Sequence, residues 1–188
     1  MIKKFVGYLS IASCCFLGAS NLAAQECNQQ ITPTASNDRL VDNGDGTVTD
    51  IQTSLMWSKC SLGQEVSSDG ACVGTPTHMD DWSTALKAAQ EAAGAEPFGY
   101  SDFRVPNIKE LASIVEYSCI EPSISLEFFN GTPNAIYYSS TPDSAVNINS
   151  ALIDGLYGRL IDFTDGTEFA RDVNKNRYVR LVRDIKSN

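Results

Sequence analysis

Three aspartates, an asparagine and two glycines fall within nine residues, in the stretch DNGDGTVTD from Asp42 to Asp50. Oxygen-bearing side chains at this density are typical of calcium loops, which need oxygen ligands at positions 1, 3, 5 and 12 and glycine at position 6. No register meets that requirement. With Gly46 at position 6, position 1 is Val41, and with Asp42 at position 1, positions 3 and 5 are glycines. We therefore interpret the stretch as the turn of a β-hairpin, where Gly and Asn adopt positive φ at low cost.

The first 24 residues have the pattern of a bacterial secretory signal, with a basic start, an apolar run over 5–19 and small residues before Gln25. The run is too short for a membrane span, so no transmembrane anchor is expected. We expect export through the Sec pathway to the periplasm, the cell surface or the medium. The alternative is a lipoprotein signal cleaved before Cys14, which would leave a second apolar run behind the cleavage site.

The charge of the chain argues against one class of partner. The full chain carries a net charge of −9. Once Lys3 and Lys4 leave with the signal, 12 basic and 23 acidic side chains remain and the charge is −11. An acidic protein is repelled by polymers of phosphate or sulfate, so we expect no nucleic-acid partner.

Cysteines and the single histidine, His78, are the other residues that could do chemistry. No CxxC pair occurs, so neither a structural zinc site nor another metal site is expected, and a thiol catalyst would lack a good base. An even number of cysteines in an exported chain favours two disulfides. Of three pairings we favour two bonds: Cys60–Cys72, which closes a Gly- and Ser-rich loop, and Cys27–Cys119, which ties the new N-terminus to the middle of the chain.

The elements that position these residues follow from periodicity and turn signals. Residues 25–38 are polar and aperiodic, and we interpret them as an extended lead-in to one domain over 39–188. A helix is predicted over 80–94, capped by Asp80 or Asp81, and a second over 107–118, where Asn107 and Glu110 have capping-box spacing. Short β-prone runs, including a three-strand meander at the start, are predicted at 39–41, 47–50, 55–60, 136–140, 158–163, 168–173 and 177–184. The fold class is α+β.

The region from 119 to 158 is the one long irregular stretch in the pattern, and loops of this length are usually functional or disordered. The disulfide at Cys119 and the aromatic strand favour a functional region. Alternation along the strand at 136–140 should bury one of its two tyrosines and expose the other for stacking on a ligand. The candidate ligand-binding residues of this region are Tyr137, Tyr138, Asp143, Asn147, Asn149 and Asp154.

Other prominent side chains are assigned structural roles. Trp57 and Trp82 occupy apolar strand and helix positions and are expected in the core. Arg104 is expected to pair with Asp102 or with a backbone carbonyl. A serine triad has no evident histidine, although distance in the sequence alone does not rule out His78. The run Asn130-Gly131-Thr132 is interpreted as a turn rather than a glycosylation site.

Several runs, in order, resemble the bacterial family named for the C-terminal domain of Lcl, a collagen-like surface protein. They are RLVDNGDGTVTDIQTSLMWSKCSLGQ, DDWSTALKAA, GYSDFRVPNIKELASIVE, CIEPSI, YYSSTP, LIDFTDGTE and RYVRLVRD, and the resemblance covers nearly all of residues 37–184. The resemblance implies a C-type-lectin-like fold related to formylglycine-generating enzymes. For the named member it implies a homotrimer that adheres to host polysaccharide.

From the residues and the resemblance we predict an exported binding or adhesion module. Its partner would be a surface glycan or an envelope protein, recognised through the loops over 119–158. The alternative is a structural component of an envelope or surface assembly. An enzyme of the formylglycine-generating type is less favoured, because every mature cysteine has a use in a disulfide. No catalytic activity and no cofactor are expected.

The turn interpretation of Asp42, Asp45 and Asp50 predicts that calcium contributes little to stability. Excess chelator should shift the melting temperature by less than about 2 °C, because a site that binds no ion adds no binding free energy to the folded state. Thermal unfolding with and without chelator measures the shift. A large drop on chelation would show that the stretch is a metal site.

Overall fold

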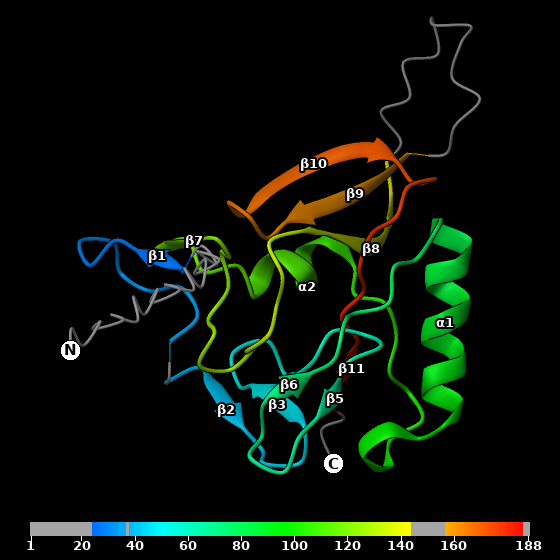
Figure 1. Cartoon of the computed structure of the whole chain (residues 1–188), viewed down its shortest axis with the longest axis horizontal. Helices are drawn as coiled ribbons and strands as arrows, with labels where there is room; N and C mark the ends of the chain where they lie inside the picture. The colour runs from blue at the N-terminus through cyan, green and yellow to red at the C-terminus, as the bar shows by residue number, and fades with distance from the viewer. Residues whose placement is uncertain (1–23, 37, 144–156, 186–188) are drawn as a thin grey trace, which may run out of the picture.

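The computed structural model describes residues 24–36, 38–143 and 157–185 (Figure 1). The predicted signal, including Cys14, lies outside these residues except for its last residue, Ala24. Among the described residues, no helix is long and apolar enough to cross a lipid bilayer.

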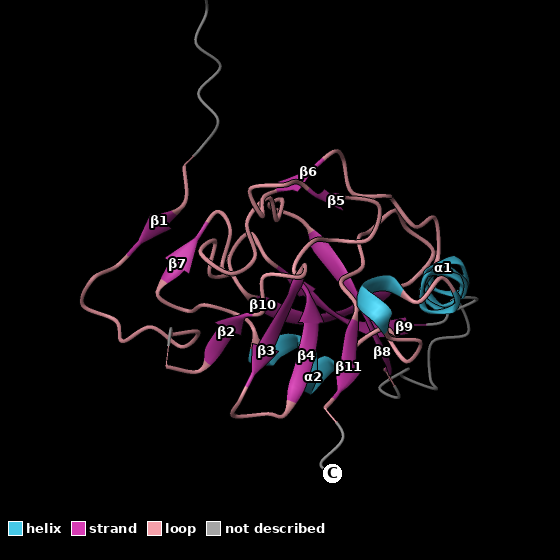
Figure 2. Cartoon of the chain, turned by 90° about the horizontal axis from the view of Figure 1, so that it is seen from below, coloured by secondary structure: helices cyan, strands magenta, loops and turns pink. Residues whose placement is uncertain are grey.

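The first sheet contains the predicted meander. Strands β2 (Leu40–Asp42), β3 (Thr47–Asp50) and β4 (Leu55–Ser58) pair antiparallel in sequence order. The C-terminal strand β11 (Val182–Asp184) adds to the free edge of β4 (Figure 2). The order β11-β4-β3-β2 thus brings the two ends of the domain into one sheet.

The aspartate-rich stretch forms the turn between β2 and β3, as predicted. Gly44 and Gly46 have φ of 74° and 92°, in the left-handed region that favours glycine. The Oδ1 atom of Asp42 accepts a hydrogen bond from the Gly44 N–H at 2.9 Å, and Oδ1 of Asp45 accepts one from the Thr47 N–H at 2.9 Å. These carboxylates therefore stabilise the turn itself. Among the described residues, no group of three or more His, Cys, Asp or Glu side chains is placed to hold a metal ion.

The second sheet has the order β10-β9-β8 and is antiparallel. It consists of β8 (Ile136–Pro142), β9 (Tyr157–Asp162) and β10 (Thr167–Asp172). The turn at Asp165-Gly166 joins β9 to β10, with Gly166 at φ 79°, so this predicted hairpin is confirmed.

The described part of the chain contains two α-helices, and both begin where the sequence predicts. Helix α1 (Trp82–Gly94) is capped by Asp81, whose Oδ1 accepts the Thr84 N–H at 2.6 Å. Helix α2 (Ile108–Ser113) has the predicted capping box of Asn107 and Glu110, but it is shorter than predicted because Ile114 leaves the helical conformation. Helix α2 packs against β8 and β9, and α1 lies beside β8 and the path to β11 (Figure 1). The α+β class is confirmed.

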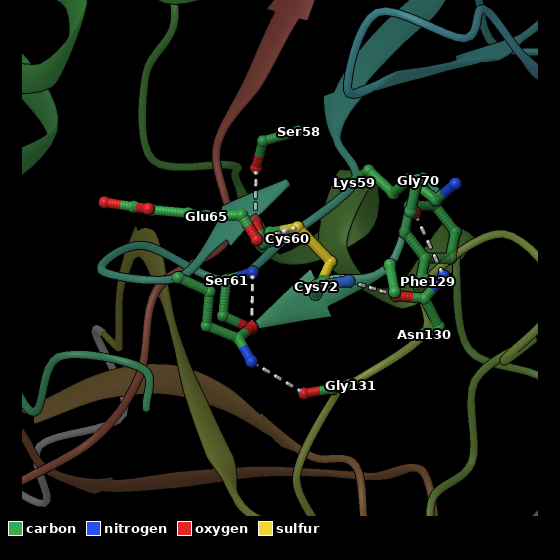
Figure 3. Close-up of a disulfide and its surroundings, with 12 residues drawn as sticks. Ser58, Lys59, Cys60, Ser61, Glu65, Gly70, Cys72, Phe129, Asn130 and Gly131 are labelled. Carbon is green, nitrogen blue, oxygen red and sulfur yellow. Dashed lines mark hydrogen bonds between the residues drawn. A yellow bond between two sulfur atoms is a disulfide. The ribbon is translucent and has the colours of Figure 1, made fainter. Parts of the chain in front are cut away.

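Both predicted disulfides are present, and each involves a two-stranded ribbon. Cys27–Cys119 joins β1 (Glu26–Cys27) to β7 (Cys119–Ile120). Cys60–Cys72 connects the end of β4 to the ribbon of β5 (Glu65–Val66) and β6 (Cys72–Val73). Figure 3 shows that Asn130 holds this ribbon to the rest of the domain, because its Oδ1 accepts the Cys72 N–H at 2.6 Å. The Asn130-Gly131 turn is thus a structural contact.

The apolar core has two parts, one on each side of the second sheet. Trp57 is fully buried in the first part with Leu111, Phe129 and Tyr137, as predicted. Trp82 is only partly buried; it packs against the second part and donates from Nε1 to the Ser139 carbonyl at 2.8 Å. A short 3₁₀ turn, η1 (Pro97–Gly99), follows α1 and leads into the connector before α2.

Arg104 has a structural role, but the predicted pairing of Arg104 with Asp102 is wrong. Its guanidinium pairs with Glu110 at 2.7 Å and with Asp184 at 3.0 Å, so it links α2 to the end of β11. Asp102 pairs instead with Arg183, Nε to Oδ1 at 2.5 Å. The two arginines face different carboxylates because the isolated bridge between Arg104 and Val182 fixes the strand register here.

Arg180 is a fully buried cation that forms no ion pair with a described carboxylate. Its Nη1 donates to the carbonyls of Ser58, at 2.9 Å, and Lys59. Its Nη2 donates to the hydroxyls of Thr132, at 2.8 Å, and Ser61, at 3.3 Å. Burial lowers the pKa of this guanidinium. The side chain therefore joins the end of β4 to the loop before β8.

Replacing Arg180 with Met should lower the free energy of unfolding by at least about 3 kcal/mol, because four buried oxygens lose their donors. The control is Arg159→Met, which removes a surface pair with Glu168 and should cost less than about 1 kcal/mol. Urea unfolding of both variants measures the difference. Equal losses in the two variants would contradict the role given to Arg180.

Glu116 anchors the lead-in to the domain. Its carboxylate accepts the backbone N–H groups of Thr34 at 2.9 Å, Ala35 at 2.8 Å and Ser118 at 2.8 Å. Burial alone would raise the pKa of Glu116, but the hydrogen bonds from Ser118, Ala35 and Thr34 outweigh it and hold the pKa below its ordinary value. The charged form is therefore favoured by folding.

Because the pKa of Glu116 is lowered in the folded state, its carboxylate stabilises the protein at pH values above 4.5, the ordinary pKa of the group. This contribution is lost as the pH falls through the lower pKa of the folded state. We expect Glu116→Gln to be less stable than the wild type by about 1–3 kcal/mol at pH 7. The gap should shrink as the pH falls below 4.5. Urea unfolding at a series of pH values tests this. A gap that stays constant down to pH ~3 would contradict it, since protonation in the unfolded state must by then oppose the charged form.

Candidate functional site

Both tyrosines of the predicted ligand site are fully buried, so neither offers a ring to a surface ligand. The prediction that alternation exposes one of them is wrong. Tyr137 faces the first part of the core and Tyr138 the second, because β8 is covered on both sides. Their hydroxyls are also used internally: Tyr137 Oη lies 2.6 Å from Ser61 Oγ, and Tyr138 Oη lies 2.7 Å from the Val173 carbonyl oxygen.

The other predicted ligand residues do not assemble into a described site. Asp143 is half-buried just after β8, where its backbone N–H donates to the Tyr157 carbonyl at 2.8 Å. Asn147, Asn149 and Asp154 lie outside the described residues. The three described candidates, Tyr137, Tyr138 and Asp143, are therefore not gathered around an open surface.

A different group of side chains surrounds a hollow of about 250 Å³ at the start of β8, which we call the His78–Tyr178 hollow. Backbone bonds bring three distant segments together here. Met79 and Arg177 exchange N–H···O=C bonds of 2.9 and 3.1 Å, and the Tyr178 N–H donates to the Ile136 carbonyl at 3.1 Å. The polar and aromatic residues that line the hollow are His78, Asn134, Asp162, Thr164, Asn176, Arg177 and Tyr178.

An imidazole and a phenol form one wall of the hollow. The Tyr178 hydroxyl lies 2.8 Å from His78 Nε2, and the two ring centroids are 4.3 Å apart. Tyr178 is half-buried and its ring also packs against Tyr137, whereas His78 is exposed. The pair thus presents a rigid aromatic surface with a hydrogen-bonding edge.

Polar groups from the end of β9, from the loop before β8 and from the segment before Arg177 also line the hollow. Asp162 pairs with Ile136 across the sheet, and its Oδ1 accepts the Thr164 N–H at 2.8 Å, which fixes the carboxylate in place. Asn134 and Asn176 are exposed amides on either side. An aromatic surface with amide, hydroxyl and carboxylate groups around it is suited to the apolar faces and hydroxyls of a sugar.

Arg177 completes the lining and is 6% exposed. Its guanidinium lies over the Tyr138 ring, 5.5 Å from the centroid. Its Nε and Nη1 atoms are buried and have no hydrogen-bond partner among the described residues. A buried polar group without a partner is uncommon and calls for an explanation.

Two of the larger hollows differ from the His78–Tyr178 hollow in their lining. One of about 480 Å³ lies beside the lead-in and includes Glu116, whose carboxylate already accepts backbone N–H groups. Another of about 350 Å³, beside Phe98 and the Cys60–Cys72 disulfide, has a mainly apolar lining that includes Leu62, Val66 and Leu181. Neither combines an aromatic surface with several uncommitted polar groups.

No serine–histidine pair forms among the described residues. Ser139 is buried and its Oγ donates to the Arg159 carbonyl at 2.6 Å, whereas His78 is bonded to Tyr178. The sequence interpretation missed this use of His78, and it assigned Tyr178 to a strand without a ligand role. The one available signal was the polar run 174–177, which directly precedes the only tyrosine of the last predicted strand.

Comparison with known proteins identifies the family but adds no relative of known role. No curated protein and no solved structure matches the chain. The C-type-lectin-like relationship therefore stays a prediction. The family model described as the Lcl C-terminal domain matches residues 46–183, which is well over half of the chain, from the first hairpin turn to β11. The chain belongs to the Lcl C-terminal domain family.

Proposed function

We propose that this domain is an exported binding module that recognises a neutral or weakly charged surface polysaccharide through the His78–Tyr178 hollow. The observation that carries the proposal is the convergence of an aromatic pair with Asn134, Asp162 and Asn176 around one opening. The region from 119 to 158 contributes Asn134, Ala135 and Ile136 to the lining, so the loops remain part of the site although their tyrosines do not.

Export is supported by two disulfides, which persist in oxidising compartments, and by the family, whose name comes from a surface protein. Delivery through the Sec pathway to the periplasm, the surface or the medium belongs to the proposal. So does the absence of catalysis: the four described cysteines are all in disulfides, which leaves no free thiol among them. Single sugar contacts are weak, and a homotrimer would strengthen them through effective concentration.

The test removes exposed side chains that line the hollow. His78→Ala and Asn134→Ala should each weaken retention on a glycan panel and on bacterial or host surfaces by about 2–10-fold, the effect of one lost hydrogen bond. The matched control is Asn174→Ala, an exposed amide on the same segment as Asn176 but outside the hollow. If both hollow variants bind as tightly as the control while their melting temperatures are unchanged, the hollow is not the binding site.

A structural role in an envelope assembly is the second candidate. Ile31, Tyr117 and Ile120 are 44%, 54% and 45% exposed, and they line one shallow hollow beside the β1–β7 ribbon. A group of exposed apolar side chains is typical of a protein contact. Loss of surface retention in Tyr117→Ser and Ile120→Ser, with the hollow variants unaffected, would favour this role over glycan binding.

A further inference from the structure

The apolar hollow of about 350 Å³ beside the Cys60–Cys72 disulfide, which we call the Phe98 hollow, shares no lining residue with the His78–Tyr178 hollow. The apolar residues of its lining come from the segment after β4, from β5, from α1 and η1 and from the segment before β11: Leu62, Val66, Ala92, Phe98 and Leu181. Its volume lies at the small end of the range for ligand pockets. It therefore has room for one large side chain rather than for a stretch of polymer.

Phe98 is held in an unusual backbone conformation at this hollow. Its φ is 61° and that of Glu96 is 50°, in the left-handed region that residues other than glycine rarely adopt. Strained residues of this kind are concentrated at ligand-binding and active sites. The Phe98 ring packs on the β2–β3 turn so closely that a Cβ at Gly46 would lie 2.6 Å from Phe98 Cε1, and it meets the Phe103 ring edge to face. Phe98 is nevertheless 36% exposed, so it forms an ordered aromatic wall that a partner can reach.

The exposed apolar surface continues onto the disulfide ribbon. Glu65 and Val73 are directly opposite each other in the β5–β6 pair, so their side chains lie on the same face. Glu65 lines the hollow, and Val73 is 46% exposed. Exposed apolar side chains gathered around a hollow are typical of a protein contact.

The polar side chains of the lining are bonded within the protein, apart from Glu65. Ser58 Oγ donates to a backbone carbonyl at 2.9 Å, and Ser61 Oγ lies 2.6 Å from the Tyr137 hydroxyl. Gln64 Nε2 donates to a backbone carbonyl at 3.1 Å. These walls therefore favour an apolar occupant.

Glu65 is the only charged residue of the lining. It is exposed, its side chain extends away from the disulfide (Figure 3), and it forms no ion pair with a described residue. The full chain has a net charge of −9, so a cationic partner is attracted both by this carboxylate and by the protein as a whole.

We propose that the Phe98 hollow is the docking site of a protein partner, which inserts one large apolar side chain against Phe98 and Val66. A lysine or arginine beside that side chain in the partner pairs with Glu65. This site is separate from the proposed glycan site, so the domain could hold a basic segment of a protein with one hollow and a polysaccharide with the other.

The experiment uses three short peptides as probes: acetyl-Lys-Phe-Lys-amide, acetyl-Lys-Ala-Lys-amide and acetyl-Glu-Phe-Glu-amide. Each is titrated into the unmodified protein and followed by NMR. We expect the first peptide to bind about tenfold more tightly than the alanine peptide, because a phenylalanine side chain is buried. It should also bind at least about twofold more tightly than the glutamate peptide, which is repelled by Glu65. Signals of Val66, Val73 and Phe98 should shift, and those of His78 and Tyr178 should not.

Two variants test the residues of the hollow. Phe98→Ala should weaken binding of the first peptide by about tenfold and Glu65→Gln by about 2–5-fold. The matched controls lie outside the hollow and should bind as the wild type does. They are Ile51→Ala, which shortens a side chain that is 59% exposed, and Glu26→Gln, which removes an exposed carboxylate from the β1–β7 ribbon.

Glu65→Gln changes one exposed side chain, so the test holds even if Phe98→Ala fails to fold. Equal affinities for the phenylalanine and alanine peptides would overturn the proposal, and so would equal affinities for the lysine and glutamate peptides. Self-association of the wild type that Phe98→Ala abolishes would also overturn it, because a second copy of the chain would then fill the hollow.

Discussion

The buried guanidinium of Arg180 is the interaction on which the domain most depends. It is surrounded by two carbonyls at the end of β4, by the hydroxyls of Ser61 and Thr132 and by the Phe129 ring at 4.9 Å. No described carboxylate neutralises it, so its charge is balanced by oriented dipoles and by the aromatic face. Such an arrangement is stable only when every acceptor is held in place. Arg180 therefore couples the meander, the disulfide ribbon and the loop before β8.

The C-terminal segment that contains Arg180 also contributes Tyr178 to the candidate site. Between Arg177 and Arg183 the chain runs from the second sheet to the first, with Tyr178 bonded to Ile136 at one end and Val182 paired with Trp57 at the other. Tyr178 is thereby fixed by backbone bonds on one side and by Tyr137 on the other. A ligand that contacts Tyr178 meets a surface that is already ordered, which keeps the entropic cost of binding low.

Local features were predictable from the sequence because their causes are local. The cap at Asp81, the capping box of Asn107 and Glu110 and the glycine turns follow from hydrogen bonds within four residues. Tyr137 and Tyr138 were misjudged because alternation predicts exposure only for a sheet with one open face. The second face of β8 is covered by a core that includes α1 and Val179, which no pattern within the strand reports. The pairing of Asp102 with Arg183 rather than with Arg104 has the same non-local origin.

The candidate site could not be predicted from the sequence, for a related reason. His78 and Tyr178 are 100 residues apart, and their contact depends on two backbone bridges to Met79 and Ile136. In the folded chain, a candidate binding group differs from a structural group in how many of its hydrogen-bond donors and acceptors are already bonded within the protein. Asp42, Asp45 and Asp50 are prominent in the sequence, yet each carboxylate is bonded to its own turn or to a neighbouring cation. Asn134 and Asn176 are inconspicuous in the sequence, yet both are exposed and line the His78–Tyr178 hollow. By that criterion the aspartate-rich turn is scaffold, and the exposed groups around Tyr178 are the proposed partners of a ligand.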